Sequence, residues 1–151
     1  MESTFEITRA SRNVLLKFLD NYSLEQLNKI PEGFSNNLIW NIAHIVVVEQ
    51  MLIYNLSGLP MLVSQEMVDQ YKKGTRPEAF VSAEEVAEIR DLLFTTIEKT
   101  REDFLSGAFK EYRPFTTMTG FEITGAAEAI AFNYYHEATH TGIMMSIRKF
   151  I

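Results

Sequence analysis

The stretch NLIWNIAHIVVVEQMLIY, residues 37–54, is the most apolar part of the chain and decides the fold. Apolar side chains stand on nearly every side of a helix drawn through it. The valine run disfavours a helix slightly, so a buried strand over Ile45–Val48 is the competing interpretation. The length of the apolar region, and the side chains of Ser35–Asn37 that can cap a first turn, favour a central helix buried on most sides. We expect this helix to end at Ser57-Gly58.

Three further long segments show the same helical spacing of apolar residues. The segment after residue 82 opens with a capping-box pattern, Ser82-Ala83-Glu84-Glu85. Because the connection before it is long enough to cross over, the simplest packing is an all-α four-helix bundle with a crossover connection, in a single domain spanning residues 1–151. The other expected landmarks are a first helix ending near Asn21, short helices over Leu24–Asn28 and Gln65–Lys72, a third long helix ending at Ser106-Gly107 and a last one starting near Thr124.

The composition excludes several classes of protein. The chain has 14 Lys and Arg against 20 Asp and Glu, a net charge of −6, and no basic run, so nucleic-acid binding is disfavoured. It has no cysteine, which excludes disulfides, thiolate nucleophiles and cysteine metal sites. No basic segment followed by an apolar one opens the chain, and polar residues interrupt its most apolar stretch, so we expect neither a signal peptide nor a membrane contact. These features predict a soluble, cytoplasmic protein.

The three histidines are the most informative residues for function. His136 and His140 are four apart in the last helix and project from one otherwise apolar face, whereas His44 lies in the most buried helix. Buried imidazoles need partners. A divalent ion, zinc or nickel, held by all three would serve, and would leave a position open for water or a substrate. The alternative is that each ring bonds to its own polar neighbour; the candidates are Asn37, Asn41, Tyr54, Asn133 and Tyr134.

The sequence His136-Glu137-Ala138-Thr139-His140 also matches the HExxH pattern of zinc peptidases, in which the glutamate is the general base. The metzincin extension is missing, because Ile143 and Ser146 stand where a Gly and a third His are needed. No strand pattern precedes the helix to bind a peptide. A peptidase is therefore disfavoured, and we expect Glu137 to be solvated or to support a ligand rather than to act as a base. Two other acidic residues are conceivable extra ligands, Glu49 and Glu122.

The runs NNLIWNIAHI at residues 36–45 and HEATHTG at residues 136–142 resemble the DinB-like (YfiT-like) superfamily of metalloenzymes, and the resemblance covers essentially the whole chain. It implies a four-helix bundle with a crossover connection. It also implies that His44, in a Trp-x-x-x-His element, binds a divalent metal together with His136 and His140 at one end of the bundle. The family often has an x-Gly-Gln element after its last histidine, and here Ile143 replaces that glutamine.

Characterised members of the family include bacillithiol-dependent S-transferases and mycothiol-dependent isomerases. The resemblance therefore implies a zinc- or nickel-dependent thiol S-transferase or hydrolase, with a low-molecular-weight thiol or another small molecule as substrate and no catalytic residue assigned beyond the ligands. The alternative is a non-catalytic helical stress-response or interaction module whose metal site is structural or vestigial. Homodimer formation is a further expectation. The aromatic residues of the third connection can serve that contact or cover the end of the bundle, namely Phe109, Tyr112, Phe115 and Phe121.

Overall fold

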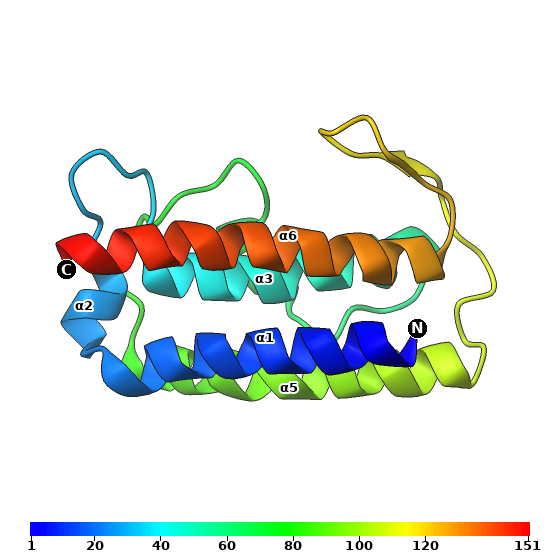
Figure 1. The fold of residues 1–151 in the computed structure, drawn as a ribbon, viewed down its shortest axis with the longest axis horizontal. Coiled ribbons are helices and arrows are strands. Elements are labelled where there is room, and N and C mark those ends of the chain that lie inside the picture. The colour runs from blue at the N-terminus through cyan, green and yellow to red at the C-terminus, as the bar shows by residue number, and fades with distance from the viewer.

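In a computed structural model that describes all of residues 1–151, the chain forms four long helices, α1 (Glu2–Asn21), α3 (Leu38–Ile53), α5 (Ala83–Leu105) and α6 (Ala126–Ile147). They lie side by side as two antiparallel pairs, α1 with α5 and α3 with α6 (Figure 1). Because α3 and α5 run in the same direction, the connection between them travels back along the bundle. The four-helix bundle with a crossover connection that the sequence predicts is confirmed.

The shorter elements lie in the connections. They are α2 (Leu24–Asn28), the 3₁₀ turn η1 (Asn55–Ser57), α4 (Gln65–Tyr71), the strands β1 (Phe115–Thr116) and β2 (Glu122–Ile123), and the terminal 3₁₀ turn η2 (Arg148–Phe150). The two strands form an antiparallel hairpin in which Phe115 pairs with Ile123. The sequence does not predict this hairpin, since two-residue strands are too short to show any periodicity. Of the four aromatic residues in this connection, Phe115 and Phe121 are exposed, and Phe109 and Tyr112 pack partly buried at the end of the bundle.

Local capping signals fix where most helices begin. The Asn37 side chain accepts a hydrogen bond from the Trp40 amide at 2.9 Å, and Ser82 with Glu85 completes a capping box at the start of α5. The predicted start of the last helix at Thr124 is two residues early. Thr124 instead lies before the helix, where its backbone N–H and hydroxyl both donate to Glu128.

Helix α3 is the core of the bundle, as the sequence predicts. Only Val48 and Met51 of its 16 residues are not buried, and the competing strand interpretation is wrong. The α-helix ends at Ile53, earlier than expected, and the chain continues as the tighter turn η1 to Gly58, whose φ of 70° suits a residue without a side chain. By length and composition Leu38–Ser57 could cross a membrane, but 83% of its most apolar window is buried inside the bundle.

One charged residue of α1 is unexpectedly buried. Arg12 has no exposed surface and lies among the buried residues Phe5, Leu15 and Leu19 of the same helix. Its guanidinium meets two buried carboxylates from α3 and α6, as described below. Pairing with these carboxylates compensates for burial of the charge. The sequence of α1 alone does not reveal it, because both partners lie in other helices.

Candidate metal centre

The three histidines that the sequence singles out lie together between α3 and α6. One ring nitrogen from each of His44, His136 and His140 lies within 4.8 Å of the other two. The Nε2 atoms of His44 and His136 are 3.3 Å apart, although the two residues are 92 positions apart in the chain. The antiparallel packing of α3 on α6 creates this cluster, because it sets the middle of one helix against the middle of the other. The site therefore lies along the two helices, and its expected position at one end of the bundle is wrong.

A backbone carbonyl fixes the protonation of His44. Its Nδ1 lies 2.6 Å from the carbonyl oxygen of Tyr71, at the end of α4. A carbonyl oxygen can only accept, so Nδ1 carries the hydrogen and the lone pair lies on Nε2. The nitrogen that faces His136 is therefore the one able to bind a cation.

The Asn41 side chain fixes His140 in the same way. The amide nitrogen of Asn41 donates to the Asn36 side chain at 2.9 Å and to the Asn37 carbonyl at 2.7 Å. With both hydrogens used, the amide oxygen is the atom that faces His140 Nδ1, at 2.8 Å. Nδ1 of His140 must then donate, which leaves the lone pair on Nε2. Among the polar partners considered from the sequence, only Asn41 hydrogen-bonds to a histidine.

The third ring is not satisfied by the protein. The Nδ1 atom of His136 is buried and has no hydrogen-bond partner. A buried polar group left unpaired costs about 1–3 kcal/mol. The cluster is therefore not a closed hydrogen-bond network of the kind that keeps ordinary core histidines stable.

The spacing of the nitrogens fits a shared metal ion. With bonds of about 2.0–2.1 Å, two imidazole nitrogens on one ion lie about 3.0–3.4 Å apart, depending on the coordination geometry. The 3.3 Å between His44 and His136 falls in this range. His44, His136 and His140 form a neutral nitrogen donor set, which suits zinc and nickel.

The surroundings keep all three rings neutral. Burial lowers the pKa of His44, opposed by its hydrogen bond to Tyr71. Burial, together with the neighbouring His140 and His44, lowers the pKa of His136 to about 3. Burial and His44 lower the pKa of His140 to about 4. Neutral imidazole is the form that coordinates metals, so the cluster is ready to bind a cation at neutral pH.

The cluster is closed on one side and open on the other. His44 is buried, and the ring of Trp40 stacks on it with centroids 4.6 Å apart. His136 and His140 are partly exposed, so the cluster borders solvent on their side. A cavity of about 720 Å³ is lined by Trp40 and Tyr71 but by none of the histidines.

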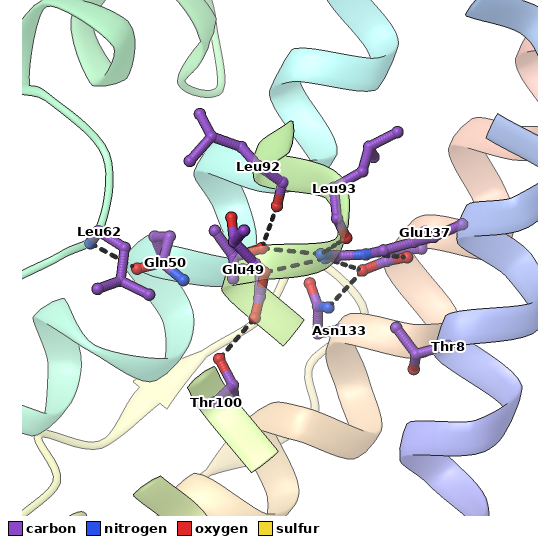
Figure 2. Close-up of polar contacts among 12 residues, drawn as sticks. Thr8, Glu49, Gln50, Leu62, Leu92, Leu93, Thr100, Asn133 and Glu137 are labelled. Atoms are coloured by element: carbon purple, nitrogen blue, oxygen red, sulfur yellow. Dashed lines mark hydrogen bonds and ion pairs between the residues drawn. The ribbon is translucent and has the colours of Figure 1, made fainter. Parts of the chain in front are cut away.

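The acidic residues considered from the sequence do not join the cluster. Glu49 and Glu137 are completely buried and reach Arg12 of α1 from α3 and α6, at 2.9 Å and 2.7 Å (Figure 2). Glu122 is exposed on the hairpin. Of the two roles expected for Glu137, solvation is wrong, since the side chain is buried, and the expectation that Glu49 is an extra ligand is also wrong. Glu137 cannot serve as a peptidase base either, since Arg12 and Asn133 occupy its carboxylate oxygens.

The fold and the cluster together define a helical bundle with a three-histidine site that can hold a metal ion. Residues 7–144 match the DinB superfamily, and the chain belongs to this superfamily. The resemblance drawn from the two histidine-containing runs is thus confirmed. No curated protein matches the chain.

Proposed function

We propose that the chain is a divalent-metal-dependent enzyme that transfers a low-molecular-weight thiol to an electrophile or, failing that, hydrolyses a small molecule. His44, His136 and His140 would hold zinc or nickel. A divalent ion supplies Lewis acidity that lowers the pKa of a thiol or water. In the transfer, sulfur forms the new bond to the electrophilic carbon, the thiol proton passes to solvent, and the leaving group departs with its bonding electrons.

The observation that carries this proposal is that three neutral imidazoles converge and that the protein does not supply a hydrogen-bond partner for every ring nitrogen. Tyr71 and Asn41 hold two of the rings by Nδ1 and leave Nε2 free. Such supporting hydrogen bonds are typical of metal-binding histidines. Three protein ligands and partial exposure are also typical of catalytic sites, which keep a position for the reactant, rather than of closed structural ones.

Metal binding is the first test. The protein, purified without a histidine tag, is stripped of metal, incubated with zinc or nickel, desalted and measured by plasma mass spectrometry. We expect one ion per wild-type chain and almost none in His44→Ala. Glu122→Ala is the matched control, because it removes an exposed acidic residue away from the cluster, and it should bind as the wild type does. Failure of the wild type to bind either metal would overturn the proposal.

Turnover is the second test. The metal-loaded protein is incubated with bacillithiol and monobromobimane, and formation of the fluorescent thioether is followed. Rates above the uncatalysed reaction that disappear in His136→Ala support the transferase. A hydrolase would instead release acid from an ester substrate without added thiol, with the same dependence on His136.

A non-catalytic module with a structural metal site is the second candidate. It is favoured by one observation: the 720 Å³ cavity is lined by Trp40 and Tyr71 and by none of the histidines, whereas a catalytic metal is expected to border the substrate cavity. In this case metal would raise the melting temperature, and neither thiol nor ester would turn over.

A further inference from the structure

Arg12 connects the two helices that carry the histidines. Its Nη2 lies 2.9 Å from Glu49 of α3 and 2.7 Å from Glu137 of α6, and its Nε donates to the second Glu137 oxygen at 3.4 Å. Its Nη1 donates to α5, to the carbonyl of Leu93 at 2.7 Å and the hydroxyl of Thr96 at 2.9 Å. All five N–H donors are used, and all four long helices meet at one guanidinium. Figure 2 shows three of the acceptor residues, Glu49, Leu93 and Glu137, drawn together.

The two carboxylates are close in sequence to the histidines but face another way. Glu137 directly follows His136, and Glu49 is five residues after His44. At about 100° per residue, Glu49 points about 140° away from His44, and Glu137 about 100° away from His136 and about 60° away from His140. Helices α3 and α6 are therefore joined twice, by the histidine cluster on one side and by Arg12 on the other.

We propose that Arg12 is a positioning residue for the metal centre: by binding Glu49 and Glu137 together, it fixes the rotation of α3 and α6 so that the histidine nitrogens converge before a metal arrives. This inference rests on the proposed metal-dependent function. Positioning of α3 and α6 by Arg12 would explain why the Nε2 atoms of His44 and His136 lie 3.3 Å apart.

The geometry makes this rotation critical. A side-chain tip lies about 5–6 Å from the helix axis, so a rotation of about 20° moves a ligand nitrogen by roughly 2 Å, a whole metal–nitrogen bond length. The apolar contacts between α3 and α6 are non-directional and tolerate such a movement. A planar guanidinium that binds two carboxylates through fixed donors does not.

Two variants test the inference, because removing Arg12 alone would leave two carboxylates buried and unpaired. Arg12→Lys keeps the charge but loses the planar fork. The triple variant Arg12→Met, Glu49→Leu, Glu137→Leu replaces the ionic cluster by apolar side chains. Tyr54→Phe is the control, since it removes a hydrogen bond from the end of α3 to Asp103 of α5 and involves neither α6 nor Arg12.

The readouts are zinc affinity, by competition with a chromophoric chelator, and the visible absorption of the cobalt-loaded protein, which reports ligand geometry. We expect Arg12→Lys and the triple variant to bind zinc roughly tenfold to a hundredfold more weakly, with altered cobalt bands. Tyr54→Phe should lower the melting temperature and leave the affinity and the bands unchanged.

Folded variants that bind zinc within twofold of the wild type, with unchanged cobalt bands, would overturn the inference and leave the proposed function intact. If the triple variant does not fold, Arg12→Lys decides the outcome by the same two measurements. Absence of zinc and cobalt binding by the wild type is a different result, since it would remove the proposed function and this inference with it.

Discussion

The histidine cluster and the Arg12 cluster lie on different faces of the same two helices and differ in how completely they are satisfied. Arg12 uses all five of its donors, and both Glu49 and Glu137 accept from more than one group. In the histidine cluster, the Nε2 atoms of His44 and His136 have only one another as partner, at a long 3.3 Å, and the buried Nδ1 of His136 has no partner.

This difference separates a structural polar cluster from a candidate binding site. Around Arg12 every guanidinium donor and both carboxylates are used, and only the Oδ1 of Asn133 lacks a partner, so the ion-paired groups have no capacity left for a ligand. Three converging imidazole nitrogens, with a fourth ring nitrogen left unpaired, can instead be satisfied by a shared cation. Burial alone does not distinguish the two, since His44 is 4% exposed and Arg12 is 0% exposed.

The largest predicted effect is the loss of stability when the Arg12 cluster is broken. Arg12→Met leaves the carboxylates of Glu49 and Glu137 without their cation in the interior, so we expect the free energy of unfolding to fall by about 3–5 kcal/mol. Urea denaturation of the metal-free protein at pH 7 measures it. His140→Gln, in the histidine cluster, should lower the free energy of unfolding far less under the same conditions. Equal losses in the two variants would show that both clusters are structural.

The next effect is the stabilisation by metal. Zinc at a hundred times its dissociation constant should raise the free energy of unfolding of the wild type by about 2.7 kcal/mol, because it binds only the folded state. His44→Ala should show no such increase. The measurement is urea denaturation with and without zinc. A similar increase in His44→Ala would mean that zinc binds elsewhere, and the comparison between the clusters would lose its basis.

A smaller effect is expected when the hydrogen bond that orients a metal-binding ring is removed. Asn41→Ala removes the acceptor of His140 Nδ1, so that this ring can rotate and change tautomer. Zinc affinity should fall tenfold to a hundredfold, about 1.4–2.7 kcal/mol. The control is Asn13→Ala, which removes an exposed asparagine of α1 and should leave the affinity unchanged. An unchanged affinity in Asn41→Ala would show that Asn41 does not orient the ring.

Local signals in the sequence account for the parts of the site that were predicted. Capping residues such as Asn37 and Ser82 mark helix starts because their side chains act on the next turn. The spacing of His136 and His140 puts both rings on one helix face. The placement of His44 opposite them depends on how α3 packs on α6, and the family resemblance supplied it.

The remaining parts depend on contacts between distant segments. The partner of His44 is a backbone carbonyl at Tyr71, and since every residue has one, no sequence pattern marks it. Arg12 is a different case, because a signal exists. It stands on the same stripe as Phe5, Leu15 and Leu19, all of them buried. A charged residue in the middle of an apolar stripe indicates a buried partner, although not which one.

The smallest effect is the response of the metal-free protein to acid. The pKa of His140 is about 4 in the folded protein, against about 6.5 when unfolded, so between these values only the unfolded chain binds the proton. Stability is therefore complete above pH 6.5 and falls as the pH decreases towards 4. At pH 5.5 the loss due to His140, which is partly exposed, should be about 1 kcal/mol.

His140→Gln isolates this contribution, because glutamine does not titrate. Urea denaturation of the metal-free wild type and variant at pH 7 and pH 5.5 should show the variant losing about 1 kcal/mol less. Saturating zinc should move the acid response of the wild type to lower pH, since the metal competes with the proton for the ring. Equal losses of stability in the two metal-free proteins would mean that the His140 ring accepts a proton in the folded state. The three histidines would then behave like ordinary solvated side chains rather than a site kept neutral for a cation.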